Sequence, residues 1–391
     1  MISTNKMKKF IITFAISCLI GLAIGIGAAV LITGKTINLA QVLLEVGIVV
    51  AGLIVSVFLH ITLHEVGHLL CGLAGGYRFV SFRIGSLTFI NQGGRTRVKR
   101  FSIAGTGGQC LMSPPTDVPL EKIPTRLYNA GGVLMNVALS AIAMVLFYAL
   151  PKEQVIVREL LMAFALIGIM LALLNGIPMK MGGIANDGYN ILKLSGDPQG
   201  THDFGVLLLV NEQSQNGVRI SEMPAEWFTE NSNVNFTDPI QVNAELMRAA
   251  REIDSDQMQQ AIQRLQPIAI DKKVIPLLAN EARCALATAF YLNRQANLAA
   301  ELLDKPLMDY IRAHASVMSD KQLLLAAKAL LTDGNRPEAE RIAAEMSRKK
   351  DEYLMQGDLV ANLEFIRRLL AIPEDADTTS TQPQSDINNQ Q

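Results

Sequence analysis

The sequence predicts a mainly α-helical membrane protein. We expect a core of about four transmembrane helices with a short cytoplasmic β-hairpin region, followed by a cytoplasmic α-helical repeat domain. Long uncharged apolar runs are confined to the first half of the 391 residues, and polar helical periodicity dominates the second half. Hydrophobic residues make up 50% of the chain and charged residues 18%. This composition is too apolar for an ordinary soluble protein and too charged for one that lies entirely in lipid.

Four apolar segments are candidate membrane spans, because each could cross much of the ~30 Å hydrocarbon core as a helix. They cover residues 10–32, 46–63, 133–150 and 160–174. Lys6, Lys8 and Lys9 precede the first segment, so a cleaved signal peptide is one interpretation of it. The apolar run is longer than the roughly 7–15 residues of a typical signal core, and we therefore favour an uncleaved anchor.

The distribution of positive charge predicts the orientation of these spans. The N-terminal lysines favour a cytoplasmic N-terminus. The loop at 77–128 holds eight lysine and arginine residues against Asp117 and Glu121, so it should also be cytoplasmic. The loops at 33–41 and 151–154 are poor in positive charge. Four spans therefore return the C-terminal half to the cytoplasm.

Charge and cysteine content exclude other classes of protein. The formal net charge of -1 indicates no bulk attraction to nucleic acid. The four cysteines form no CxxC pair, so they indicate free thiols in a reducing compartment or in the membrane rather than a disulfide framework. They are Cys18, Cys71, Cys110 and Cys284.

The segment LHEVGHLL at 63–70 holds the most informative side chains. Residues four apart share one face of a helix, so His64 and His68 can present two imidazoles to one metal ion, with Glu65 beside them. This arrangement supplies two nitrogen ligands for Zn²⁺ and a carboxylate that can take a proton from water. The alternative, two buried histidines held by polar neighbours, is costly at membrane depth. His60 lies one turn earlier and could be a spare ligand or gate, although we favour a polar residue lining the cavity.

A catalytic zinc site needs a third protein ligand and an open position. After the fourth span, Pro178 ends the helix, and the glycines at 182–188 allow an irregular backbone, which membrane proteins tolerate where it lines a cavity. Asp187 could turn back there toward the histidines, since both motifs lie at cytoplasmic ends of their spans. The other interpretation of Asp187 is an ordinary Asp-Gly turn at a helix exit.

Together these features resemble the site-2-protease family of intramembrane zinc metalloproteases, over roughly residues 40 to 195. The HEVGH at 64–68 matches the family's HExxH, the AGGVLMN at 130–136 looks like its small-residue-plus-Asn motif, and 175–188 looks like its NxxP…DG segment. Asp187 follows Asn175 by twelve positions, a longer spacing than is usual in that family.

The resemblance implies that His64, His68 and Asp187 bind zinc and that Glu65 acts first as general base and then as general acid. It implies that Asn136 and Asn175 help to hold the substrate backbone. The expected protein is a multi-pass endopeptidase of a bacterial cell membrane. It would cut a transmembrane or signal-peptide-derived substrate near the cytoplasmic face.

The basic loop contains an aromatic and β-branched stretch, 77–90, that predicts one or two strands near the membrane surface. By the same resemblance, this hairpin would present an unwound substrate as an added strand. A basic loop held against anionic lipid headgroups is the alternative, and both can be true. The loop between the third and fourth spans is too short for the PDZ domain that some relatives carry.

The second half of the chain predicts a separate helical unit. Three alanine pairs recur with identical internal spacing on neighbouring predicted helices, as stacked helical hairpins require. They are Ala249/Ala261, Ala287/Ala299 and Ala327/Ala339. The pattern resembles tetratricopeptide repeats, although a generic helical bundle is an equal alternative. The predicted domains are a membrane-embedded metalloprotease domain at 1–200, a linker at 201–238, the helical domain at 239–372 and a disordered tail at 373–391.

Two other functions compete with the endopeptidase. One is a proteolytically inactive membrane scaffold that recruits a cytoplasmic protein partner through its helical repeats. The intact Glu65 disfavours it, because a scaffold has no use for the base. The other is a transporter, which we disfavour because the four spans show no inverted repeat.

Overall fold

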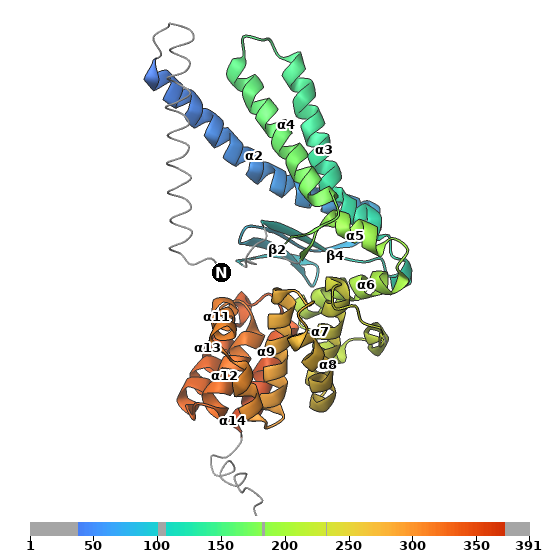
Figure 1. The fold of residues 1–391 in the computed structure, drawn as a ribbon, viewed down its shortest axis with the longest axis vertical. Helices are drawn as coiled ribbons and strands as arrows, with labels where there is room; N and C mark the ends of the chain where they lie inside the picture. The colour runs from blue at the N-terminus through green and yellow to red at the C-terminus, as the bar shows by residue number, and fades with distance from the viewer. Residues whose placement is uncertain (1–37, 101–106, 182–183, 232, 372–391) are drawn as a thin grey trace, which may run out of the picture. The chain divides into compact units, whose positions relative to one another are not determined.

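The computed structural model describes residues 38–100, 107–181, 184–231 and 233–371, and it is mainly helical with one small sheet (Figure 1). The described chain forms two compact units. One unit contains the described residues up to Phe58 together with Ser140–Ile167, and the other contains Leu59–Leu139 and the chain from Gly168 onward. The predicted span at 10–32 and the predicted disordered tail at 373–391 lie outside the described residues.

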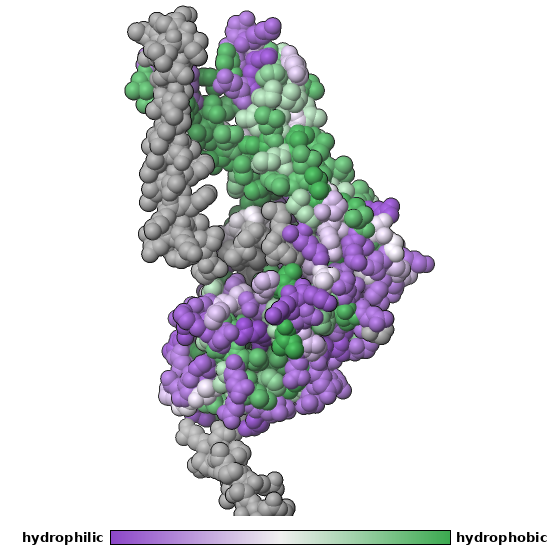
Figure 2. Space-filling view, viewed as in Figure 1, coloured by the Kyte–Doolittle hydropathy of each residue, from purple (hydrophilic) through white to green (hydrophobic). Residues whose placement is uncertain are grey.

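Three helices in the described part of the chain are long and apolar enough to cross a membrane. They are α2 (Leu39–Ala74), α3 (Thr125–Ala149) and α4 (Val155–Gly176). Large apolar side chains on them face outward, and Figure 2 shows this as a continuous hydrophobic surface over the three helices; examples are Leu44, Ile54, Val145 and Leu166. Such a surface requires apolar surroundings, which is consistent with a membrane protein. Helices α2 and α4 extend beyond the predicted spans at both ends, and α3 begins earlier than predicted.

The first unit is held together by close helix packing and by one capping arginine. A Cβ atom on Gly52 of α2 would lie only 2.2 Å from the Leu160 Cδ2 atom of α4, so the leucine side chain packs directly over this glycine. The Arg158 guanidinium donates to the carbonyls of Phe147 and Leu150 at 2.7 and 2.8 Å. It thereby satisfies carbonyl groups at the C-terminal end of α3 that have no partner within the helix.

In the second unit, a four-stranded antiparallel sheet has the order β3-β2-β1-β4. Its strands are β1 (Arg78–Ile84), β2 (Leu87–Gln92), β3 (Arg95–Arg100) and β4 (Gly108–Ser113). Strands β1 and β2 confirm the strands predicted within 77–90. The two further strands were not predicted, because β3 is almost entirely polar and β4 has no alternation of polar and apolar residues.

The sheet has two chemically different faces, because paired residues in antiparallel strands point to the same side. Phe82 pairs with Phe89 on one neighbour and with Cys110 on the other, which makes one face apolar. Arg83 pairs with Thr88 and with Gln109, which makes the opposite face polar.

The C-terminal part of the second unit consists of helices with amphipathic patterns (Figure 1). They are α7 (Pro239–Asp254), α8 (Met258–Ile270), α9 (Pro276–Leu292), α10 (Ala296–Leu302), α11 (Lys305–His314), α12 (Ser319–Leu331), α13 (Arg336–Arg348) and α14 (Gln356–Leu370). Each predicted alanine pair places one alanine on each of two successive helices, and all six alanines are buried in a common core. The helix pairing is therefore confirmed at these residues, whereas the tetratricopeptide resemblance remains a prediction.

The segment at 201–238, predicted as a linker, contains most of helix α6 (Pro198–Gln215) and two short 3₁₀ helices, Ile220–Glu222 and Ala225–Phe228. Helix α6 packs against β4 on one side and against α7 on another. Its buried residues lie on all sides of the helix, so the sequence shows no clear amphipathic period there.

Candidate metal centre

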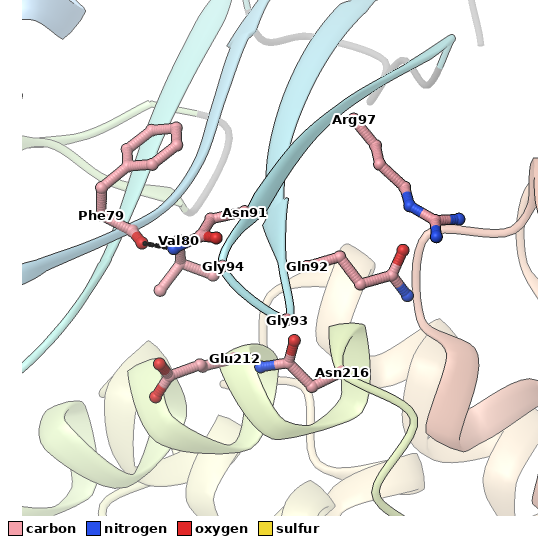
Figure 3. Close-up of a pocket in the computed structure, with 9 residues that line it drawn as sticks. All are labelled: Phe79, Val80, Asn91, Gln92, Gly93, Gly94, Arg97, Glu212 and Asn216. Carbon is pink, nitrogen blue, oxygen red and sulfur yellow. Dashed lines mark hydrogen bonds between the residues drawn. The ribbon is translucent and has the colours of Figure 1, made fainter.

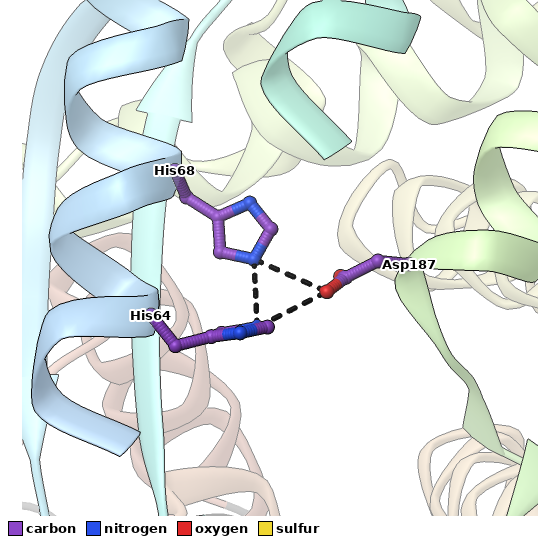
Figure 4. A group of neighbouring side chains, drawn as sticks. All are labelled: His64, His68 and Asp187. Atoms are coloured by element: carbon purple, nitrogen blue, oxygen red, sulfur yellow. Dashed lines mark hydrogen bonds and ion pairs between the residues drawn. The ribbon is translucent and has the colours of Figure 1, made fainter. Parts of the chain in front are cut away.

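Helix α2 and the start of helix α5 (Asp187–Leu194) bring three potential metal ligands together. Figure 4 shows His64 and His68 pointing from one face of α2 toward the carboxylate of Asp187. The two Nε2 atoms lie 3.2 Å apart, and Asp187 Oδ2 lies 3.1 Å from His64 Nε2 and 3.4 Å from His68 Nε2. The structure therefore brings together the three side chains that the sequence named, including the distant aspartate, and their binding of a metal stays a prediction.

The spacing of these three atoms fits a shared metal ion. In a tetrahedral site with ligand bonds of about 2.0–2.1 Å, the ligand atoms lie about 3.3–3.4 Å from one another. The two histidines are buried. Within the described part of the chain, Asp187 Oδ2 makes ion-pair contacts with both imidazoles and has no hydrogen-bond partner. Two imidazole nitrogens and a carboxylate oxygen, all aimed at one point, form a donor set suited to a divalent transition metal.

A backbone carbonyl fixes the tautomer of His68. Its Nδ1 lies 2.8 Å from the carbonyl oxygen of Tyr128 on α3. A carbonyl can only accept a hydrogen bond, so Nδ1 carries the proton and the lone pair of the neutral ring lies on Nε2, the atom that faces the cluster. Outer contacts of this kind orient metal-binding histidines.

Asn136 performs the corresponding contact for His64. Its fully buried amide lies 3.2 Å from His64 Nδ1 and 3.1 Å from His60 Nδ1. In the structure the amide nitrogen donates to His64 Nδ1, and the amide oxygen accepts from His60 Nδ1. A 180° rotation of this amide would let His64 Nδ1–H donate and leave the lone pair of Nε2 for a metal. The geometry thus favours an orienting role for Asn136, and it places His60 behind His64 rather than in the ligand cluster.

Close backbone contact lets α3 reach the histidines. A Cβ on Gly67 would lie 2.2 Å from the carbonyl oxygen of Gly131, and a Cβ on Gly131 would lie 2.3 Å from the carbonyl oxygen of Gly67. A Cβ on Gly132 would collide with the His64 ring at 2.4 Å. The glycines in HEVGH and AGGVLMN therefore provide the room that the imidazole and the helix crossing need.

Asp187 is held by the N-terminus of α5 and by the asparagine before it. Asn186 caps the helix, because its Oδ1 accepts from the backbone N–H of Tyr189 at 2.9 Å. Its Nδ2 donates to the carbonyls of Leu174 and Ile177 at 2.8 and 2.7 Å, which ties α5 to the end of α4. This bracing contact forms only in the folded chain, because it joins residues that lie 9 and 12 positions apart.

The long spacing between Asn175 and Asp187 is taken up by a small hairpin. Strands β5 (Lys180–Met181) and β6 (Ile184–Ala185) pair antiparallel, and α5 begins directly after them. Gly188 packs tightly, since a Cβ there would lie 2.1 Å from the carbonyl oxygen of Gly176. The extra residues thus leave Asp187 beside the histidines.

The electrostatic surroundings keep Asp187 charged. Burial alone would raise the pKa of its carboxyl group, but the adjacent imidazoles of His64 and His68 outweigh this effect and lower the pKa to about 2. A carboxylate that is ionised at neutral pH is the form that binds a metal ion.

Glu65 lies between the ligand cluster and β4. A Cβ on Gly108 would lie 2.7 Å from Glu65 Cγ and 3.0 Å from its Oε1, so the strand can pass here only with a glycine. The carboxylate also interacts with the backbone of Cys110 and feels the charges of His64, His68 and Asp187. It therefore lies close enough to act on a group bound at the cluster, without being one of the three ligands.

Asn175 does not join this group. Its Nδ2 donates to the carbonyl of Leu171 at 3.0 Å, a contact within its own helix. A separate polar cavity of about 590 Å³ lies where the β2–β3 turn meets the end of α6 (Figure 3). Its lining includes Gly93, Arg97 and Glu212 but none of the predicted site residues.

Comparisons with family models, curated proteins and solved structures found no match to this chain.

Proposed function

We propose that the protein is an intramembrane zinc metalloendopeptidase that cuts a membrane-embedded protein or peptide precursor near the cytoplasmic face. The observation that carries the proposal is the triangle of His64, His68 and Asp187 atoms, each 3.1–3.4 Å from the next, with Glu65 beside it. Zinc bound there would polarise the scissile carbonyl and lower the pKa of an attacking water. The apolar outer surfaces of α2, α3 and α4 support a membrane location.

In this proposal each residue of the chain has a separate task. His64, His68 and Asp187 hold the ion, with the tautomers of the histidines set by Asn136 and Tyr128. Glu65 takes a proton from the attacking water as general base and returns it to the leaving nitrogen as general acid. The resemblance also implies that Asn175 binds the substrate. No contact of Asn175 in the described part of the chain supports that role.

The sheet suggests how a substrate would be presented. Strand β4 is at one end of the described sheet, and its Gly108 and Cys110 border Glu65. An extended substrate segment added alongside β4 would bring its backbone next to this carboxylate. A transmembrane substrate would have to unwind first, because its helical backbone groups are already hydrogen-bonded. The basic residues of the sheet region and the polar C-terminal helices favour placing both in the cytoplasm.

Zinc content and cleavage, measured on the same purified protein, test the proposal. We expect about one zinc ion per chain and cleavage of a model transmembrane peptide in proteoliposomes. Glu65→Gln should keep the zinc and lose roughly 10²- to 10⁴-fold in turnover. Glu153→Gln, an exposed loop variant, is the matched control and should keep both. Zinc-loaded wild type that cleaves no better than Glu65→Gln would support the inactive scaffold instead.

A further inference from the structure

The second unit contains a partly enclosed cavity of about 430 Å³ behind the strand that borders Glu65. On β4, Gly108 and Cys110 lie toward Glu65, whereas Gln109 and Leu111 line this cavity from the opposite face of the strand. Helices α6, α9, α12 and α14 supply much of the remaining wall. Its volume falls in the range of small-ligand pockets, about 300–1,000 Å³.

Most of the cavity wall is apolar. Leu277 and Leu278 of α9 line one part, and Val317, Met318 and Leu354 line another. Such a wall binds the hydrocarbon portion of a ligand, and the few polar groups in it decide which ligand head is accepted.

Two side chains of the wall have oxygen atoms that can accept further hydrogen bonds. Asp358 accepts a hydrogen bond from the Ser214 hydroxyl at 2.7 Å, and it forms no ion pair in the described part of the chain. Gln215, the residue after Ser214, has its side-chain oxygen buried without a hydrogen-bond partner among the described residues. The Asp358 side chain is exposed, whereas the Gln215 oxygen is buried, and a buried acceptor normally has a donor. A ligand with N–H groups could donate to both residues.

No basic group of the wall neutralises Asp358. Reduced hydration beside the cavity wall raises the pKa of this carboxyl group to about 6, and its charged neighbours Asp320 and Asp254, both acidic, act in the same direction. Lys321, which is fully buried, is held by Glu281 and Asp320, each at 2.6 Å.

The other basic side chains that line the cavity donate hydrogen bonds to backbone carbonyl oxygens. Arg83 donates to the carbonyls of Gly85 and Gly108 at 2.9 and 3.3 Å. His314 donates through Nδ1 to the carbonyl of Tyr310 at 2.8 Å. The cavity therefore combines apolar walls with a carboxylate that has no cation beside it.

We propose that this cavity binds a lysine or arginine side chain of a short basic and apolar peptide segment, with the cationic head on Asp358 and the Gln215 oxygen. The hydrocarbon stem would lie along the leucine and methionine wall, as long basic side chains do on apolar surfaces. An ammonium or guanidinium supplies several donors at once, which both acceptors require.

The segment we assign to the cavity is the cytoplasmic flank of the substrate, an assignment that rests on the proposed function. Cytoplasmic flanks of transmembrane segments are enriched in lysine and arginine. The cavity and Glu65 lie on opposite faces of the same strand, so one substrate could place its flank in the cavity and its scissile bond near Glu65.

Direct peptide binding to the full chain tests this inference. A short fluorescent peptide that alternates leucine and lysine is titrated into detergent-solubilised Glu65→Gln protein, in buffer well above the pKa of Asp358. The matched peptide carries norleucine in place of each lysine, which keeps the hydrocarbon stem and removes the charge. We expect the lysine peptide to bind more tightly, and Asp358→Asn to weaken its binding by about tenfold, as the loss of a charge-assisted hydrogen bond predicts.

Asp309→Asn is the matched control, because Asp309 is an exposed aspartate on α11 outside the cavity lining. It should bind both peptides as the parent does, which separates cavity binding from partition of the peptide into the micelle. Equal affinity for the two peptides, or an unchanged affinity in Asp358→Asn, would overturn the inference. Because binding is read without cleavage, it can succeed where the proteolysis assay fails, and cleavage that is insensitive to Asp358→Asn would refute the cavity alone.

Discussion

Two groups of buried polar side chains differ in the atoms that they face. One group lies near the start of α5, and the other lies among the C-terminal helices. In the C-terminal helices, buried charges such as that of Arg248 meet opposite charges: Arg248 of α7 lies 3.1 Å from Asp203 of α6 and 2.6 Å from Glu245. In the metal centre, by contrast, His64, His68 and Asp187 turn the atoms that bear their lone pairs toward one point. The first arrangement is complete in itself, whereas the second could hold a cation.

The supporting residues differ in the same way. Around the candidate metal centre, Asn136 and the Tyr128 carbonyl contact the far nitrogens of the histidines, and the near nitrogens face Asp187. Among the C-terminal helices, Lys321 is fully buried and shared by Glu281 and Asp320. We conclude that the burial of charged side chains does not by itself indicate a functional site. The convergence of potential metal-ligand atoms on one point is the better indication.

The largest effect should follow the loss of the third ligand. Asp187→Ala leaves two histidines, which hold a metal weakly, so we expect the zinc affinity to fall by more than about a hundredfold, beyond the loss from an outer-contact residue. Competition with a chromophoric chelator measures the affinity. Asp117→Ala, an exposed aspartate in the same unit, should retain full affinity. Full zinc binding in Asp187→Ala would move the third ligand elsewhere.

The opposite result is expected for the buried ion-pair network. Arg248→Met leaves Asp203 and Glu245 buried with less compensation, and breaking such a pair typically lowers the free energy of unfolding by about 3–5 kcal/mol. Zinc content per folded molecule should not change. Thermal unfolding and metal analysis of the same samples check both parts, with the exposed Arg312→Met as control. If Arg248→Met lost zinc while remaining folded, the two regions would not be separable in this way.

The histidine pair could be predicted from sequence because its spacing is local. Four residues form about one helical turn, so His64 and His68 share a face in any straight helix. The approach of Asp187 was also predictable, from its place at the end of a span. Its bracing was not, because Asn186 contacts carbonyls that the chain brings close only after α4 ends and β5 and β6 form.

The role of Asn136 and the extent of the sheet were not predictable for a different physical reason. Asn136 reaches His64 only because Gly67 and Gly131 allow α2 and α3 to touch at the backbone, a contact between residues far apart in the chain. Strand β3 (RTRVKR) shows no alternating apolar pattern. Its backbone pairing with β2, rather than the burial of apolar side chains, holds it in the sheet. The pattern of polar and apolar side chains in a sequence indicates which residues are buried. The contacts described here depend on backbone geometry, which that pattern does not reveal.

The two asparagines of the family-like motifs should differ in a way that sharpens the comparison. Asn136→Ala removes the contact to His64 Nδ1, and loss of such outer contacts typically lowers metal affinity by about 10- to 100-fold. Asn175→Ala removes only a hydrogen bond within its own helix, so the affinity should stay close to that of the wild type. The same chelator competition measures both. Equal losses in the two variants would contradict an orienting role specific to Asn136.

The smallest effect on the metal should come from the alanine contacts of the C-terminal helices, where the expected change is in stability alone. Ala287 on α9 has no exposed surface, and its methyl group packs within the core that also contains Ala299. Ala287→Leu forces extra volume into this contact, and overpacking of a core typically costs about 1–3 kcal/mol. Ala313→Leu on α11 makes the same change at an exposed position and should be nearly neutral. Chemical denaturation measures the difference between the two variants, and zinc per folded chain should be equal in both. A similar loss of stability in Ala313→Leu would show that leucine itself, rather than the tight alanine contact, is responsible.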